Sequence, residues 1–254
     1  FRKGKFFASY ITADKGKKVY LFEVVKALSD AGVNLFEIGV PFSDPIADGP
    51  VIQEAMQKAL ENETSLNDAL NLGRKIREIT EAPLILFTYI NPILAHGKEV
   101  YDEIKKAGFD GLLIVDLPFE EASEVASRIK KAKLDPIFIL TPSTSDFRAS
   151  KIVYEAQGFI YYVCQKGTTG VRDALPKDFE STISKLKSKT SIPFLAGFGI
   201  SNYESAKNAL NYADGFVVGS AIVKMISDLR SPEEIKRFAE SLDPRKVKHG
   251  IPIV

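Results

Sequence analysis

Short runs of hydrophobic residues alternate along this chain with longer segments in which hydrophobic residues recur every three or four positions. The short runs are nearly uninterrupted, which is typical of parallel strands that are covered on both faces. They predict eight strands, which are Phe6–Thr12, Asn34–Val40, Leu84–Thr88, Gly111–Asp116, Pro136–Leu140, Phe159–Val163, Pro193–Ala196 and Gly215–Val218.

The longer segments predict amphipathic helices between these strands. In Val19–Asp30 the hydrophobic residues fall on one face, and Gly32 follows the end of the helix. A further short helix is expected after Ser220. The other predicted helices are Val51–Leu60, Leu66–Ile79, Lys98–Ala107, Glu120–Ala132, Asp146–Glu155, Pro176–Lys187, Asn202–Leu210 and Pro232–Leu242.

This alternation predicts an α/β fold, a single-domain (β/α)8 TIM barrel that spans residues 1–254. A weak repeat supports it, because Ala31–Asn34, Ala107–Asp110 and Tyr212–Gly215 each join a helix end to a new strand. The alternative is a doubly wound open sheet. It is disfavoured because the first strand runs into Ala13–Gly16, which lacks the glycine-rich dinucleotide motif.

Composition excludes several classes of protein. The 34 Lys and Arg residues balance 33 Asp and Glu residues, so no net field favours nucleic acid or an anionic membrane. No apolar run approaches the roughly 20 residues of a membrane-spanning helix. The single cysteine, Cys164, cannot form an intrachain disulfide, which fits a reducing cytoplasm. The two histidines, His96 and His249, are too few and too separated in sequence for a metal cluster. The chain begins at Phe1 rather than methionine, so we expect further native residues before it.

Carboxylates at the second predicted strand are the first candidates for chemistry. Glu37 lies between Phe36 and Ile38, where a buried acid is costly unless it has a partner or a task. The loop that follows carries Asp44 and Asp48, and an acid on a strand beside an acid on a loop suits proton transfer. A turn role remains open for both loop acids.

Polar and glycine-rich segments follow several other predicted strands, at the barrel end that usually holds the active site. Asp116 ends the fourth strand and could instead be a structural acid that pairs with a loop amide. Gly170, Gly199 and Gly219 allow backbone N–H groups to approach an anion, and Ser220 begins a short helix. Each glycine alone could simply serve a turn, but together they favour a phosphate site.

The run FEIGVPFSDPIADGPVIQ at 36–53 closely resembles the signature of the tryptophan synthase alpha chain family. The resemblance continues in order through most of the chain. It includes Phe87–Pro92, Gly111–Pro118, Gly167–Gly170, Gly197–Ser201 and Gly219–Val223.

The resemblance implies retro-aldol cleavage of indole-3-glycerol phosphate to indole and glyceraldehyde 3-phosphate. It implies that Glu37 is the general acid and base and that Asp48 accepts a hydrogen bond from the indole N–H. It implies no metal and no cofactor in this chain, with pyridoxal phosphate in the beta partner. The residues implied to position the substrate are Tyr161, Tyr89, Thr169, Phe87 and Leu113, and those implied to bind phosphate are Gly170, Gly199, Gly219 and Ser220.

The resemblance also implies a cytoplasmic alpha2beta2 assembly in which this chain activates the beta subunit allosterically. The loops implied to contact the beta subunit contain Phe42, Asp44, Pro45, Asn91, Pro92 and Pro118.

Three departures from the family pattern keep an alternative open. Phe87 and Val115 stand where smaller residues are common, and Gln165 lies in a changed segment before the sixth loop. Extra volume beside the indole site typically costs about 1–3 kcal/mol. The alternative is therefore an activating subunit for the beta chain with weak or lost lyase activity. A different phosphate-binding barrel, such as a sugar-phosphate isomerase or decarboxylase, is a third hypothesis.

Overall fold

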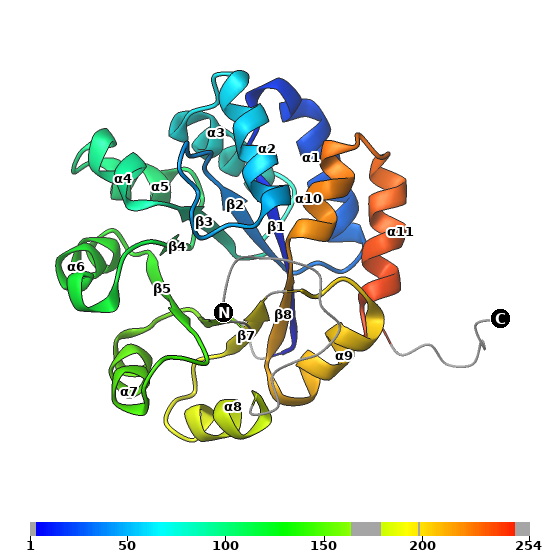
Figure 1. Ribbon diagram of the computed structural model, residues 1–254. Helices are drawn as coiled ribbons and strands as arrows, with labels where there is room; N and C mark the ends of the chain where they lie inside the picture. Colours follow the sequence, from blue (N-terminus) through cyan, green and yellow to red (C-terminus); the bar gives the residue numbers. More distant parts are fainter. Residues whose placement is uncertain (1–3, 164–178, 198, 247–254) are drawn as a thin grey trace.

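Eight parallel strands close into a barrel in the computed structural model, which describes residues 4–163, 179–197 and 199–246 (Figure 1). The strands pair in chain order, and β8 pairs with β1. This confirms the predicted barrel, with ends shifted by one or two residues. The strands are β1 (Phe6–Thr12), β2 (Leu35–Gly39), β3 (Leu84–Thr88), β4 (Gly111–Ile114), β5 (Asp135–Leu140), β6 (Ile160–Val163), β7 (Phe194–Gly197) and β8 (Gly215–Val218).

Successive residues of each strand face two different apolar layers. In β1, Phe7 and Ile11 pack in the layer between strands and helices, whereas Tyr10 packs inside the barrel. In β2, Phe36 and Ile38 belong to the outer layer. The alternation therefore turns the intervening Glu37 into the barrel interior.

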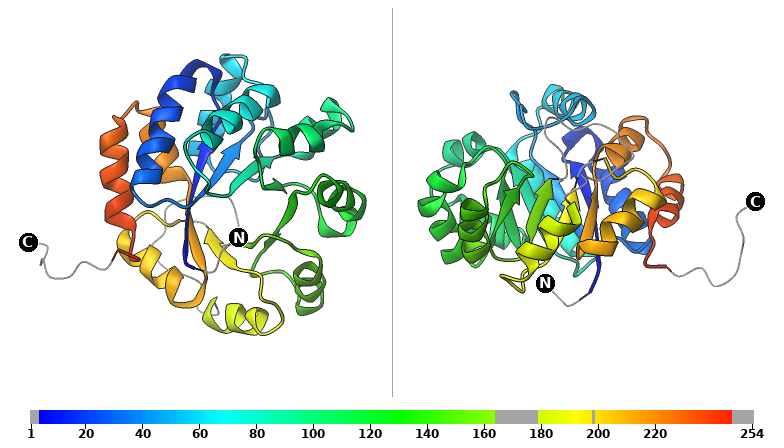
Figure 2. Two further views of the ribbon diagram at one scale, coloured as in Figure 1. Left: turned by 180° about the vertical axis from the view of Figure 1, so that it is seen from behind. Right: turned by 60° about the horizontal axis from the view of Figure 1, so that its bottom comes forward.

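Helices surround the barrel on its outside (Figure 2). Three of them begin with capping boxes that satisfy free N–H groups of the first turn, namely α3 (Leu66–Arg77), α9 (Tyr203–Tyr212) and α11 (Pro232–Leu242). The α-helices are α1 (Lys18–Asp30), α2 (Pro50–Glu61), α3 (Leu66–Arg77), α4 (Ile90–His96), α5 (Val100–Lys106), α6 (Ser123–Lys131), α7 (Asp146–Glu155), α8 (Phe179–Lys187), α9 (Tyr203–Tyr212), α10 (Ser220–Ser227) and α11 (Pro232–Leu242), and the short 3₁₀ helices are η1 (Lys15–Lys17) and η2 (Phe119–Glu121).

Two helices differ from the sequence prediction. Helix α4 occupies a segment that was predicted to be a loop after the third strand. In the structure Pro92 lies in the first turn of α4, where a missing N–H group costs little. Asp116 Oδ1 accepts a hydrogen bond from Ile90 N at 2.8 Å, so Asp116 has the structural role considered above. The predicted helix Glu120–Ala132 is divided into η2 and α6.

The repeat seen in the sequence forms equivalent contacts at the amino-terminal end of the barrel. Asp110 Oδ2 accepts a hydrogen bond from Leu84 N at 3.0 Å, and Asp214 Oδ2 accepts one from Phe194 N at 3.0 Å. Each side chain therefore links the start of its own strand to the start of an earlier strand of the barrel.

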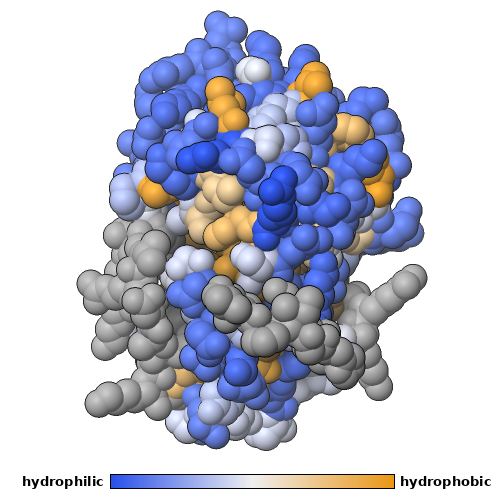
Figure 3. Space-filling model, turned by 90° about the vertical axis from the view of Figure 1, so that its right-hand side faces the viewer, coloured by the Kyte–Doolittle hydropathy of each residue, from blue (hydrophilic) through white to orange (hydrophobic). Residues whose placement is uncertain are grey.

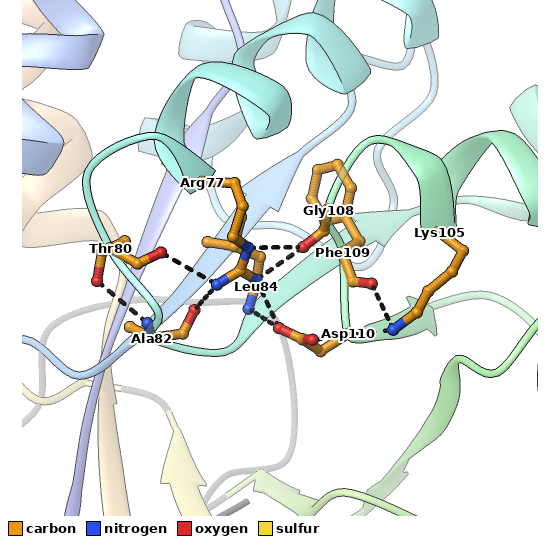
Figure 4. A network of polar contacts seen from close by, with 8 residues as sticks. All are labelled: Arg77, Thr80, Ala82, Leu84, Lys105, Gly108, Phe109 and Asp110. Carbon is orange, nitrogen blue, oxygen red and sulfur yellow. Dashed lines mark hydrogen bonds and ion pairs between the residues drawn. The ribbon is translucent and has the colours of Figure 1, made fainter.

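Arg77 extends this end of the barrel into a larger polar network (Figure 4). Its guanidinium donates to the carbonyl oxygens of Thr80, Ala82 and Gly108. It also forms an ion pair with Asp110 at 2.7 Å. Because Arg77 ends α3 and Asp110 precedes β4, the network joins two βα units far from the carboxyl ends of the strands.

The face shown in Figure 3 is mostly hydrophilic, and its apolar residues form small separate groups. Among the described residues, no helix combines the length and the hydrophobicity that crossing a membrane requires.

Candidate active site at the carboxyl ends of the strands

Glu37 is the most deeply buried acid of the site. Its side chain is 1% exposed, and its Oε1 atom has no hydrogen-bond partner among the described residues. Its neighbours in the sheet are Tyr10 of β1 and Ile85 of β3. Burial raises the pKa of Glu37 to about 8. The carboxyl group therefore holds a proton at neutral pH.

Asp48 is also buried but has a defined partner. It lies in the loop between β2 and α2, is 4% exposed, and accepts a hydrogen bond from Tyr89 Oη at 2.6 Å. Burial raises the pKa of Asp48 to about 6, against the opposing effect of the Tyr89 hydrogen bond. Asp48 is thus mostly ionised at neutral pH, and the two acids differ in charge.

The loop that carries Asp48 is fixed by contacts on both sides. Gln53 Nε2 donates to the carbonyl oxygens of Asp48 and Pro45, at 2.9 and 3.2 Å. Tyr89 Oη also accepts a hydrogen bond from Ala47 N at 3.1 Å, and the Tyr89 ring stacks on Phe42. Tyr89 therefore holds both the backbone and the carboxylate of this loop.

Aromatic and aliphatic side chains surround the two acids inside the barrel. The predicted residues Phe87, Leu113, Tyr89 and Tyr161 belong to one buried apolar cluster there. Gly197 leaves space for Tyr161, because a Cβ atom at that position would lie 2.3 Å from the tyrosine ring. Aromatic and aliphatic side chains beside two acids suit contact with a flat apolar ring that has one polar edge.

Tyr10 is a further residue of this cluster, and the sequence did not single it out. It is 3% exposed and contacts Phe87 edge to face, with 5.2 Å between the ring centroids. Its pKa is raised by burial and then by the nearby charges of Asp48 and Glu37. A tyrosine in an apolar strand resembles an ordinary core residue, so no signal in the sequence marks this position.

The predicted phosphate residues that the structure describes lie after β7 and β8. Gly199 adopts a φ of 73°, a conformation that favours glycine. Gly219 caps the N-terminus of α10, and Ser220 is the first residue of that helix. A helix N-terminus attracts anions. Thr169, Gly170 and Gln165 lie outside the described residues, as does Cys164.

The residues predicted to contact a partner lie on three neighbouring segments. Phe42, Asp44 and Pro45 belong to the β2–α2 loop, which also exposes Ile46 (76% exposed). Asn91 and Pro92 belong to α4, where Leu94 is 64% exposed. Pro118 follows β4 and is exposed. Ile46 lies within the loop predicted to contact the partner, whereas Leu94 was missed because exposure is not visible in the sequence.

No group of three or more His, Cys, Asp or Glu side chains suited to a metal ion occurs in the described part of the chain.

Comparison with known proteins identifies the family. Residues 2–251 match the family model of the tryptophan synthase alpha chain. The alpha chain of Coxiella burnetii is 48% identical over 244 residues, covering 96% of this chain and 95% of that protein. Among solved structures, the alpha subunit from Legionella pneumophila is 33% identical with a TM-score of 0.83, and covers 94% of this chain and 91% of that one.

A tryptophan synthase complex from Pyrococcus furiosus gives a TM-score of 0.85 at 33% identity, covering 95% of this chain and 98% of the matched chain. In this family the alpha chain needs no cofactor, and pyridoxal phosphate belongs to the beta chain. The chain belongs to the tryptophan synthase alpha chain family and is an indole-3-glycerol phosphate lyase.

Proposed function

We propose that Glu37 is the general acid and base of the lyase reaction and that Asp48 binds the indole N–H. The observation that supports this assignment is the contrast between the two buried carboxyl groups. Glu37 has an unpartnered oxygen and a pKa raised to about 8, whereas Asp48 is bonded to Tyr89 and has a pKa of about 6. At neutral pH the site therefore offers one proton donor and one carboxylate.

The reaction divides into two proton transfers. Protonated Glu37 delivers its proton to indole C3, and the Asp48 carboxylate stabilises the positive charge that forms on the ring nitrogen. The Glu37 carboxylate then takes the proton of the glycerol hydroxyl next to the ring. The electron pair of the breaking carbon–carbon bond returns to the ring. The products are indole and an aldehyde, glyceraldehyde 3-phosphate, and Glu37 is again protonated.

The phosphate end of the substrate is assigned to the loops after β7 and β8. Gly199, Gly219 and Ser220 offer backbone N–H groups and the N-terminus of the eight-residue helix α10. Among the residues outside the described part, Gly170 is assigned to phosphate binding and Thr169 to substrate positioning. Phe87, Leu113, Tyr89 and Tyr161 would hold the indole ring.

Indole release from indole-3-glycerol phosphate tests the two acids directly. We expect Glu37→Gln to lower kcat by at least about 10²-fold, because a general acid and base contributes about 10²–10⁴-fold. Asp48→Asn should also lower kcat, since it loses the negative charge opposite the ring nitrogen. Glu23→Gln, a change on the exposed side of α1, is the matched control and should not alter turnover.

Unchanged turnover in Glu37→Gln would contradict the assignment.

We further propose that the rim around Phe42, Asp44, Pro45, Asn91, Pro92 and Pro118 binds a tryptophan synthase beta subunit in an alpha2beta2 complex and activates it. Two observations support this: the similarity to chains of tryptophan synthase complexes, and the exposure of Ile46 and Leu94 on the same segments. Exposed large apolar side chains beside a polar surface are typical of interfaces.

A further inference from the structure

Tyr10 lies between the predicted phosphate-binding residue Gly219 and the strand that carries Glu37. Its Cβ atom lies near Gly219, since a Cβ built on that glycine would be 3.8 Å away. Its hydroxyl lies over Gly39 of β2, where an added Cβ would be only 2.0 Å from the oxygen. Gly39 is two residues after Glu37 and faces the same interior. The Tyr10 hydroxyl therefore lies against β2, the strand that carries Glu37.

Two buried polar atoms on these neighbouring strands lack hydrogen bonds. Tyr10 Oη and Glu37 Oε1 both have no partner among the described residues, although Tyr10 and Glu37 are paired in the β1–β2 ladder. An unpartnered buried polar group is costly, and such groups in native proteins need an explanation. A ligand hydroxyl can satisfy both at once, because its oxygen accepts one hydrogen bond while its hydrogen donates another.

We propose that Tyr10 is a substrate-contacting residue of the lyase site, whose phenol donates a hydrogen bond to the same glycerol hydroxyl that Glu37 deprotonates. This inference depends on the role proposed for Glu37. In the cleavage step the hydroxyl proton moves to Glu37, and the carbon–carbon electron pair moves to the indole ring. Tyr10 keeps its proton throughout and stabilises the negative charge that develops on the hydroxyl oxygen.

Other groups around Tyr10 are consistent with a donor that stays neutral. The charges of Asp48, Tyr89 and Glu37 act on the Tyr10 phenol, and Phe87 lies against its ring. Thr12 is close enough to oppose the rise in the Tyr10 pKa, but its hydroxyl does not complete a hydrogen bond to Tyr10 Oη. Burial and the two carboxylates raise the pKa of Tyr10 well above its usual range. A phenol that does not ionise remains a hydrogen-bond donor over the working range of the enzyme.

The test compares two ligands in Tyr10→Phe and the unmodified chain. One ligand is indole-3-glycerol phosphate, and the other is an indole that carries a phosphorylated propyl chain without hydroxyls. For the substrate we expect kcat/KM to fall about tenfold, the equivalent of one hydrogen bond. The affinity for the propyl analogue should change less than twofold, because that ligand lacks the hydroxyl that Tyr10 contacts.

Ser9→Ala is the matched control. Ser9 is the preceding residue of β1, is fully buried, and also has an unpartnered hydroxyl, but strand alternation directs it away from the barrel interior. Its removal should leave the ratio between the two ligands unchanged. The pH dependence of kcat/KM should keep its alkaline limb in Tyr10→Phe, since Tyr10 acts on the substrate rather than on Glu37.

Equal losses for both ligands, no loss for the substrate, or a shifted alkaline limb would each overturn the proposal. Glu37→Gln is measured in parallel, so that the two hypotheses fail separately. Unchanged turnover in Glu37→Gln would refute the general acid and base. If Tyr10→Phe still distinguishes the substrate from the propyl analogue as the unmodified chain does, while Glu37→Gln is inactive, only the role of Tyr10 is refuted.

Discussion

The two acids of the site differ because their immediate surroundings differ. Glu37 is enclosed by apolar side chains and has an unpartnered oxygen, so its neutral form is favoured. Asp48 accepts a hydrogen bond from Tyr89, which supports its charged form. The alternation of Phe36, Glu37 and Ile38 predicted the inward carboxylate. The Tyr89 bond was not predictable, because it joins residues 41 positions apart.

Tyr89→Phe is expected to raise the pKa of Asp48 further. The Tyr89 hydrogen bond lowers that pKa, and its loss leaves burial unopposed. The acid limb of the kcat/KM profile should therefore move to higher pH. Tyr154→Phe, at a side chain that is 87% exposed, should leave the limb in place. A limb that stays fixed in Tyr89→Phe would show that Asp48 does not set it.

The raised pKa of Glu37 also predicts a pH dependence of stability. Its folded value of about 8 exceeds the ordinary 4.5, so the folded state retains a proton that the unfolded state releases between these values. Stability should fall as the pH rises through this window, by up to about 1.4 kcal/mol for each pH unit. Glu37→Gln should remove this dependence.

Denaturant unfolding at pH 5 and pH 8 measures the effect. Glu37→Gln should gain stability relative to the unmodified chain at pH 8 and much less at pH 5. An equal difference at both pH values would argue against a buried, protonated Glu37.

At the scale of elements, the two ends of the barrel serve different purposes. The carboxyl ends carry Glu37 and the Asp48 loop, whereas the amino ends carry structural contacts of Arg77, Asp110 and Asp214. Hydrophobic periodicity predicted most of these elements. Helix α4 was missed because Asn91-Pro92 favours a turn when only local sequence is considered. The helix start is held by the Asp116 bond to Ile90 N, which comes from another strand end and is not visible in the local sequence.

Arg77→Ala is expected to destabilise the fold without affecting chemistry. The variant leaves three carbonyl oxygens and the Asp110 carboxylate without their shared donor (Figure 4). The free energy of unfolding should fall by about 2–3 kcal/mol, since the lost hydrogen bonds involve a charged group. Arg74→Ala, on the exposed side of the same helix, should cost less than about 0.5 kcal/mol.

Both variants should keep the kcat of the unmodified chain at a temperature where they remain folded. A large loss of kcat in folded Arg77→Ala would contradict the separation of stability and chemistry between the two barrel ends.

At the scale of the whole molecule, the balanced charge provides no net field that would attract nucleic acids or anionic membranes. It therefore favours small molecules and protein partners as ligands. The sequence predicted the loops of the partner rim through their family resemblance. It could not predict that Ile46 and Leu94 would be exposed, because exposure depends on how α4 and the β2–α2 loop are placed.

Leu94→Asp is expected to weaken binding to a beta subunit while the lyase reaction of the isolated chain stays unchanged. Burial of an unpaired charge in an apolar contact typically costs several kcal/mol. Sedimentation of the mixture measures assembly, and indole-plus-serine condensation measures activation. Val19→Asp, at a 71% exposed position of α1 outside the rim, is the control. Undiminished assembly of Leu94→Asp would place the interface elsewhere.

The most direct test of the paired acids is the pH dependence of kcat/KM for indole-3-glycerol phosphate, which reports the ionisation of the free enzyme. Ionised Asp48 and protonated Glu37 together predict a bell-shaped profile, with limbs near the pKa values of about 6 and about 8. Asp48→Asn should lose the acid limb. A rate that keeps rising above pH 9 would contradict the need for a protonated Glu37.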